Sequence, residues 1–202
     1  MASPKRLGVF GGAFDPPHLA HLALVEAALQ QLTLDELRMV PTGQAWHKSR
    51  PLSPAQHRLA MAKLAFGGLQ KVVVDERETL RAGPSYTIDT LRELKTEQPG
   101  IELFLILGGD QARALPTWRE YEDVLQCATI CIAERQDDSR PKAVPGSNNP
   151  LAGRFLRLQM PLSPLSATAI RQRAAAGENV SPLVGTAVAR YIAQHHLYST
   201  SA

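Results

Sequence analysis

One segment near the amino terminus combines residues that can bind phosphate. Gly11 and Gly12 follow an apolar run directly, and residues without side chains let backbone N–H groups approach an anion closely. His18 and His21 follow in the same segment, and their spacing places both imidazoles on one face of a first helical turn. The positive end of the helix dipole lies beside them. The segment therefore predicts a phosphate site with two imidazole donors.

The residues between the glycines and the histidines favour a loop of one fixed shape. Phe14 can pack beneath the loop, and the carboxylate of Asp15 can accept backbone hydrogen bonds. Pro16 and Pro17 restrict the backbone where the helix begins. A loop held in this way keeps its donors in position before a ligand arrives.

Three other interpretations of the histidine pair have less support. Either histidine alone is more typical of a surface or core residue, but the pair after two glycines and Asp-Pro favours ligand binding. A metal site would need a third ligand, and HExxH-like partners are absent nearby. A dinucleotide fingerprint, GxGxxG, would need a third glycine, and this sequence has histidines at the helix start instead.

Apolar periodicity predicts strands that alternate with helices along the chain. The predicted strands are Arg6–Phe10, Glu36–Val40, Val72–Val74, Glu102–Leu107, Ala128–Ala133 and Phe155–Leu158. The predicted helices are Pro17–Gln31, Ser53–Phe66, Thr87–Gln98, Tyr121–Gln126, Thr168–Ala176 and Pro182–His195, and Ser53 is expected to cap the second of them. This alternation favours an α/β fold, a doubly wound open parallel sheet with helices on both faces. We expect one domain over residues 1–202, with a loop at 136–149 and a helical segment from about 160 to 202.

Polar segments follow several of the predicted strands. They read GGAFDPPH, PTGQAWHK, GGDQ and AERQ. Ligands of open parallel sheets bind beyond the carboxyl ends of the strands, so these segments are expected to meet at one site.

The composition is that of an ordinary globular protein. The 202 residues are 44% apolar and 20% charged, and no apolar run approaches the roughly 20 residues of a membrane span. The run Leu7–Phe10 is too short for the core of a secretory signal. Cys127 and Cys131 match neither a disulfide framework nor a zinc site, so we expect a reducing cytoplasm.

The net charge is compatible with an anionic partner. A formal charge of +3 and a pI near 9.0 attract phosphates as readily as nucleic acid. However, the sequence has no basic run long enough for a DNA-binding stripe, and its 5% of aromatic residues offer few platforms for stacking bases. We therefore expect small-molecule substrates and neither a nucleic-acid nor a membrane partner.

The first segment also carries a family resemblance. GGAFDPPHLAH resembles the GGxFDPxHxGH signature of the HxGH nucleotidyltransferases, with Ala13 where threonine is common and Ala20 where glycine is usual. Near the carboxyl end, Leu165–Arg171 (LSATAIR) resembles the family's ISSTxIR segment. The resemblance implies a Rossmann-like sheet, two histidines that contact the triphosphate of ATP, and no covalent enzyme intermediate. Ser166 and Thr168 can also cap the helix that follows them.

Three further segments resemble the bacterial nicotinate mononucleotide adenylyltransferases. Gly83–Leu91 (GPSYTIDTL) contains the PSYT segment, Pro116–Trp118 is the PTW segment, and Pro41–Lys48 (PTGQAWHK) resembles the segment ending in His-Lys or His-Arg. The resemblance implies transfer of AMP from ATP to nicotinate mononucleotide in NAD biosynthesis, with Mg²⁺ accompanying ATP. A pyridine ring favours an aromatic face, and its carboxylate favours hydrogen-bond donors.

The resemblance assigns roles to individual residues. The implied catalytic residues are His18, His21 and Arg171. The implied ATP-binding residues are Gly11, Gly12, Ala13, Phe14, His18, His21, Gly108, Asp110, Arg135, Ser166, Thr168 and Arg171. The implied acceptor-binding residues are His47, Lys48, Ser85, Tyr86, Thr87 and Trp118.

Other functions remain as alternatives. An adenylyltransferase could act on phosphopantetheine or on nicotinamide mononucleotide, and the PSYT and PTW segments argue against phosphopantetheine. A nucleotide-binding regulator without turnover is a second alternative. A basic nucleic-acid module is a third, supported by the pI alone.

Overall fold

The computed structural model describes residues 3–44, 51–135, 154–160, 163 and 165–199, without the side chains of residues 134 and 135. Its strands form one six-stranded parallel sheet in the order β3-β2-β1-β4-β5-β6. They are β1 (Arg6–Gly12), β2 (Glu36–Pro41), β3 (Val72–Val74), β4 (Glu102–Gly108), β5 (Thr129–Arg135) and β6 (Phe155–Met160). Because the strand order reverses between β1 and β4, the sheet has its topological switch point there.

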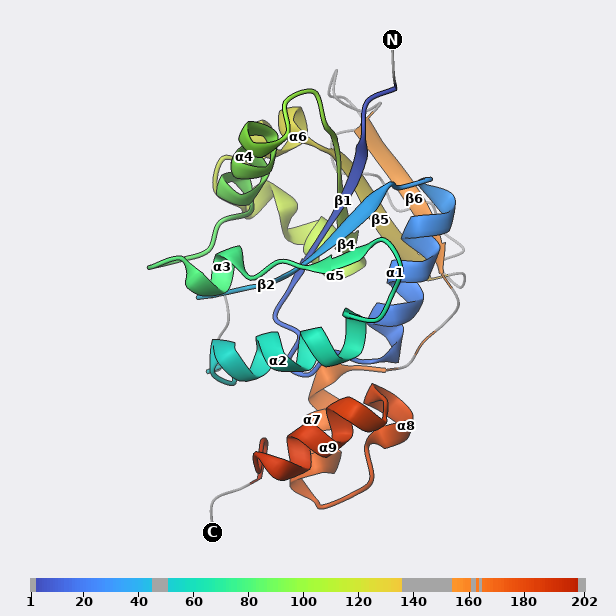
Figure 1. Ribbon diagram of the computed structural model, residues 1–202, viewed down its shortest axis with the longest axis vertical. Coiled ribbons are helices and arrows are strands. Elements are labelled where there is room, and N and C mark those ends of the chain that lie inside the picture. The colour runs from blue at the N-terminus through green and yellow to red at the C-terminus, as the bar shows by residue number, and fades with distance from the viewer. Residues whose placement is uncertain (1–2, 45–50, 136–153, 161–162, 164, 200–202) are drawn as a thin grey trace.

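Helices cover both faces of the sheet (Figure 1). The longer ones are α1 (Leu19–Gln31), α2 (Ala55–Phe66), α4 (Thr87–Glu97), α6 (Tyr121–Cys127), α7 (Ala167–Ala175) and α9 (Thr186–Gln194). The short ones are α3 (Arg77–Leu80), α5 (Gly109–Ala114), the 3₁₀ helix η1 (Leu115–Thr117) and α8 (Ser181–Val184). The predicted α/β Rossmann-like fold is confirmed.

Side chains of the central strands alternate between two cores. Along β4, Leu103, Leu105 and Leu107 join the core under α4 and α6, and Phe104 and Ile106 join the core under α1 and α2. This alternation follows from the period of two residues in a strand. Burial on both faces explains why the sequence of β4 is continuously apolar.

The carboxyl-terminal helices pack away from the sheet, against α2. In Figure 1, α7, α8 and α9 lie at the lower end of the molecule, next to α2. A third core joins Met61 of α2 to Ile170, Val184, Val188 and Ile192 of these helices. The helix α2 therefore connects the sheet to the carboxyl-terminal helices. None of the described helices is long and apolar enough to cross a membrane.

The predicted element bounds need three corrections. The single predicted helix Pro182–His195 is wrong, because Gly185 adopts a φ of 83° and separates α8 from α9. Ser53 does not cap α2, which begins after Pro54. The short helices α3, α5 and η1 were not predicted. The other predicted strands and helices end within two residues of the observed bounds, and the predicted loop 136–149 lies outside the described residues.

Candidate functional site

The two histidines stack at the start of α1. His18 is the residue before the helix, and its backbone N–H donates to Nδ1 of His21 over 3.2 Å. Their ring centroids are 3.8 Å apart and nearly parallel. Because Nδ1 of His21 accepts a hydrogen bond, its proton is placed on Nε2. The predicted placement of both imidazoles on one side of the first turn is confirmed.

Both imidazoles are neutral near pH 7. Burial lowers the pKa of His18 to about 4. Burial also lowers the pKa of His21 to about 3, and the neighbouring His18 adds to the effect. Nδ1 of His18 is buried and has no hydrogen-bond partner within the described residues. A neutral imidazole still carries one N–H group, so the pair can act as neutral hydrogen-bond donors.

Aromatic packing holds the loop between β1 and α1. Phe14 is 2% exposed, and its ring meets those of Phe10 and Phe66 edge to face, with centroids 5.6 Å away in both cases. A Cβ on Gly12 would lie 3.0 Å from the Phe14 ring, so glycine lets the backbone pass close to it. The predicted packing of Phe14 beneath the loop is confirmed.

A buried arginine, which sequence reasoning missed, fixes the same loop from α2. Arg58 is 1% exposed and donates to the backbone carbonyls of Ala13, Gly43 and Ser53 over 3.0, 2.9 and 2.8 Å. The only signal in the sequence is that Arg58 shares a helix face with the apolar residue Met61. Because the guanidinium satisfies carbonyls of three segments, it sets their relative positions.

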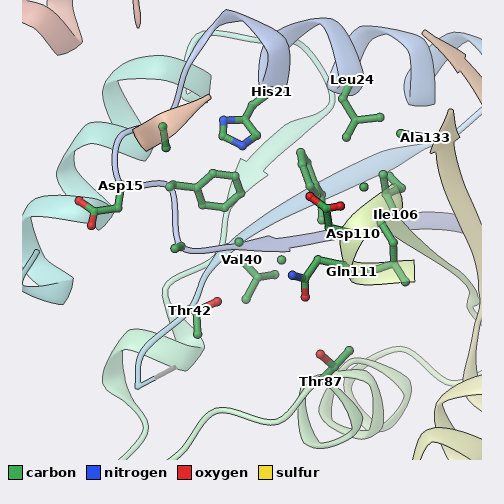
Figure 2. Close-up of a pocket in the computed structure, with 18 of the residues that line it drawn as sticks. Asp15, His21, Leu24, Val40, Thr42, Thr87, Ile106, Asp110, Gln111 and Ala133 are labelled. Atoms are coloured by element: carbon green, nitrogen blue, oxygen red, sulfur yellow. The ribbon is translucent and has the colours of Figure 1, made fainter. Parts of the chain in front are cut away.

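Asp15 links the loop to distant parts of the chain. Its carboxylate accepts from the hydroxyl of Tyr198 over 2.8 Å and from the backbone N–H of Ser53 over 3.2 Å. Its backbone carbonyl accepts from Nη1 of Arg171 over 2.8 Å. Figure 2 shows the Asp15 side chain directed toward α2 and away from the middle of the pocket. The prediction that Asp15 accepts backbone hydrogen bonds is confirmed, and its contact with Tyr198 was not predicted.

The second motif supplies a helix cap and a cation. The hydroxyl of Ser166 accepts from the N–H of Ala169 over 3.2 Å, so the predicted cap is present. Thr168 lies inside α7, and its hydroxyl accepts from Nη2 of Arg171 over 3.0 Å. The prediction that Thr168 also caps the helix is therefore wrong. These bonds place the Arg171 guanidinium between α7 and the loop after β1.

A cavity of about 610 Å³ lies at the carboxyl ends of β1 and β4, where the strand order reverses (Figure 2). The predicted site residues that line it are Gly11, Gly12, Ala13, Phe14, His18, His21, Ser85, Tyr86, Thr87, Gly108, Asp110, Trp118, Ser166, Thr168 and Arg171. His47 and Lys48 lie outside the described residues, as does the side chain of Arg135. Segments far apart in the sequence thus meet at the edge of the sheet where ligands of this fold bind.

The comparisons with known proteins agree with this arrangement. The model of the cytidylyltransferase-like family matches residues 9–173, a range that contains both motifs. The chain belongs to the cytidylyltransferase-like family. It is 59% identical to a probable nicotinate-nucleotide adenylyltransferase of Albidiferax ferrireducens, over 98% of this chain and 100% of the relative. A protein of the same description from Methylibium petroleiphilum is 44% identical over 98% of this chain and 95% of the relative.

A solved structure shares the fold of this cytidylyltransferase-like chain. The nicotinic acid mononucleotide adenylyltransferase of Plasmodium falciparum, solved with NaAD, matches with a TM-score of 0.74. The match covers 96% of this chain and 97% of that chain at 20% sequence identity. At this identity the likeness supports the Rossmann-like fold.

In this cytidylyltransferase-like chain, the end of the cavity opposite the two histidines begins at α4. Tyr86 immediately precedes the helix, and Cζ of Arg119 lies 4.6 Å from the centroid of its ring. The hydroxyl of Ser85 is buried and has no partner in the described part of the chain. Trp118 is half-buried against the core under α4 and α6. Sequence reasoning missed Arg119, which no motif contains.

A buried carboxyl group also lines this end. Glu78 is 7% exposed, and the hydroxyl of Thr90 donates to it over 2.8 Å. Burial raises the pKa of Glu78. A Cβ on Gly43 would lie 2.0 Å from the Glu78 carbonyl oxygen, so only glycine allows this close approach. Glu78 and Thr90 were also missed, because their pairing depends on the contact of α3 with α4.

Asp110 and Gln111 face the cavity from the end of β4 (Figure 2). Asp110 lies in the first turn of α5 and is largely exposed, with Arg113 as its ion-pair partner. The carboxylate is therefore accessible to a ligand that donates hydroxyl hydrogen bonds.

Proposed function

We propose that this chain transfers AMP from ATP to nicotinate mononucleotide, giving nicotinate adenine dinucleotide and pyrophosphate, in NAD biosynthesis. The observation that carries the proposal is one cavity with two neutral imidazoles at one end and Tyr86 and Trp118 at the other. The relatives that are 59% and 44% identical bear the name of this activity. The Plasmodium falciparum neighbour was solved with NaAD, which is the product of such a transfer.

The reaction requires the protein to align the two substrates and to stabilise the charge that develops. An oxygen of the acceptor's phosphate forms a bond to the α-phosphorus of ATP, and the bond from that phosphorus to pyrophosphate breaks. The acceptor phosphate is already a nucleophile, so no catalytic base is required, and no covalent intermediate forms on the protein. His18, His21 and Arg171 stabilise the negative charge that accumulates on the departing pyrophosphate.

The loop and both motifs supply the remaining contacts to ATP. Backbone N–H groups from Gly11 to Phe14 and polar groups of Ser166 and Thr168 face the phosphates in this proposal. The Asp110 carboxylate accepts from the ribose hydroxyls, and Arg135 and Gly108 complete the nucleotide site. His47 and Lys48 are assigned to the acceptor side, as are Ser85 and Thr87.

Mg²⁺ enters this proposal as part of the substrate MgATP. Within the described residues, no group of three His, Cys, Asp or Glu side chains is placed to hold a metal ion. Phosphate oxygens and water would therefore supply its ligands. We assign the enzyme to the cytoplasm, because Cys127 and Cys131 are free thiols and a reducing compartment preserves them.

Release of pyrophosphate from MgATP with a panel of acceptors tests the function. We expect turnover with nicotinate mononucleotide, less with nicotinamide mononucleotide, and none with phosphopantetheine. Turnover with phosphopantetheine alone would assign a different acceptor. Absence of turnover with every acceptor, in protein that binds ATP, would favour a regulator.

A further inference from the structure

The two ends of the cavity differ in the charges that line them. The charged side chains among the described lining residues are Asp15, Glu78, Asp110, Arg119 and Arg171. Arg171 lies at the end that contains His18 and His21, which we call the phosphate end, and it bonds there to Asp15 and Thr168. Arg119 lies at the opposite end, which contains Tyr86 and Trp118 and which we call the acceptor end, and its guanidinium lies over the ring of Tyr86. Within the described part of the acceptor end, Arg119 therefore supplies the positive charge.

Two contacts hold the Arg119 guanidinium in place. Its Cζ lies 4.6 Å from the ring centroid of Tyr86, at the start of α4. Its Nε donates over 3.1 Å to Glu120, at the start of α6. Glu120 also pairs with Arg92 over 2.8 Å. The planar group is thus positioned before a ligand arrives, although its side chain is exposed to solvent.

The acid and amide acceptors differ in charge on the pyridine base. Nicotinate mononucleotide has a positive ring and a negative carboxylate, so its base is neutral overall. The base of nicotinamide mononucleotide has the same positive ring and an uncharged amide. A nearby cation attracts the carboxylate of the first and repels the ring of the second.

The neighbouring polar groups distinguish the two acceptors poorly. The hydroxyls of Ser85 and Thr87 can donate or accept, so they suit a carboxylate and an amide alike. The Glu78 carboxyl, whose pKa is raised by burial, can also do both when it is protonated. A guanidinium presents donors alone and keeps its charge.

We infer that Arg119 is a specificity-determining residue that selects nicotinate mononucleotide over nicotinamide mononucleotide by attracting the carboxylate on its ring. The inference rests on the proposed function and names the group that sets its acceptor preference.

Acceptor kinetics of Arg119 variants test this inference. We would measure kcat/KM for both acceptors at saturating MgATP in Arg119→Ala and Arg119→Gln. The ratio of the acid to the amide value should fall roughly tenfold or more, which corresponds to loss of a charged hydrogen bond. Arg119→Lys should retain part of the preference, because it keeps the charge and loses the planar group.

Arg92→Ala is the matched control. Arg92 is also an exposed arginine that pairs with Glu120, but it does not line the cavity. Its removal should leave the ratio of the two acceptors unchanged. The KM for ATP and the thermal midpoint should stay constant in every variant, which separates a change in acceptor preference from unfolding.

Two results would overturn the role of Arg119. An equal loss for both acceptors would mean that Arg119 contacts their common ribose phosphate. An unchanged ratio in Arg119→Ala and Arg119→Gln would mean that other groups select the acid. If the unmodified protein turns over neither acceptor, the proposed function fails instead, and the two failures are distinguishable.

Discussion

The phosphate end and the acceptor end of the cavity are held together in different ways. At the phosphate end, the buried side chains of Asp15 and Arg58 join segments far apart in the chain through hydrogen bonds with Tyr198 and Ala13. At the acceptor end, the buried bond between Thr90 and Glu78 joins residues only 12 positions apart, and Arg119 is exposed and is held by Tyr86 and a neighbouring glutamate. The first arrangement fixes geometry for a charged transition state. The second allows acceptor contacts to change with little effect on the fold.

Replacing Arg58 should have the largest effect on the free energy of unfolding, because it removes contacts that hold the phosphate end together. Arg58→Met removes a buried guanidinium and leaves the carbonyls of Ala13, Gly43 and Ser53 without this donor, so we expect a loss of about 3–5 kcal/mol in the free energy of unfolding. Urea denaturation measures it. The control Lys63→Met removes an exposed pair on the same helix and should cost at most about 1 kcal/mol. Equal losses in both variants would contradict the comparison.

Removing one imidazole donor should abolish most turnover without unfolding the chain. His18→Ala is expected to lower kcat about 100- to 1,000-fold, which corresponds to about 2.7–4 kcal/mol of lost transition-state stabilisation. Steady-state kinetics at saturating MgATP and acceptor measures the effect, and circular dichroism confirms the fold. Near-normal turnover would show that the buried imidazole has no part in the reaction.

Tyr198→Phe sharpens the comparison by removing one hydroxyl. The change deletes the hydrogen bond to the Asp15 carboxylate and should lower the free energy of unfolding by about 1.5–3 kcal/mol. Because Asp15 also bonds to Arg171, kcat should fall while the KM of the acceptor changes little. A selective rise in the acceptor KM would place this contact at the wrong end of the cavity.

The neutral histidines predict that stability depends on pH. An unfolded histidine has a pKa of about 6.5, whereas His18 and His21 have pKa values of about 4 and 3 in the fold. The unfolded chain therefore takes up protons first as the pH falls, and stability decreases below pH 6.5. The slope approaches about 1.4 kcal/mol per pH unit for each histidine.

Urea denaturation from pH 7.5 to pH 5 measures this slope. In His18→Ala, the slope of the free energy of unfolding with pH should be smaller by the contribution of one histidine. Because both imidazoles stay neutral, kcat should not follow a histidine titration between pH 6.5 and 8. A steeper slope in His18→Ala would mean that the imidazole is charged in the folded protein.

Local patterns in the sequence predicted the sheet and the motifs, but they did not predict contacts between residues far apart in the chain. Strands β1, β4 and β5 contain continuous apolar runs, and residues such as Gly12 and Ser166 act within a few positions of their partners. The helices α3 and α5 are too short for a periodic pattern to emerge. Arg58 and Glu78 are understood only from the segments that surround them, and Gly185 ends a helix through a backbone conformation that composition does not reveal.

The contact between Asp15 and Tyr198 spans 183 positions of the chain. Closing a loop of this length costs conformational entropy before the contact stabilises the fold, so we expect this contact to form late in folding. The sheet can therefore assemble before the loop after β1 receives its last partner. Recovery of activity during refolding should lag behind recovery of β-sheet signals, so catalysis would report the docking of α7, α8 and α9 rather than formation of the sheet.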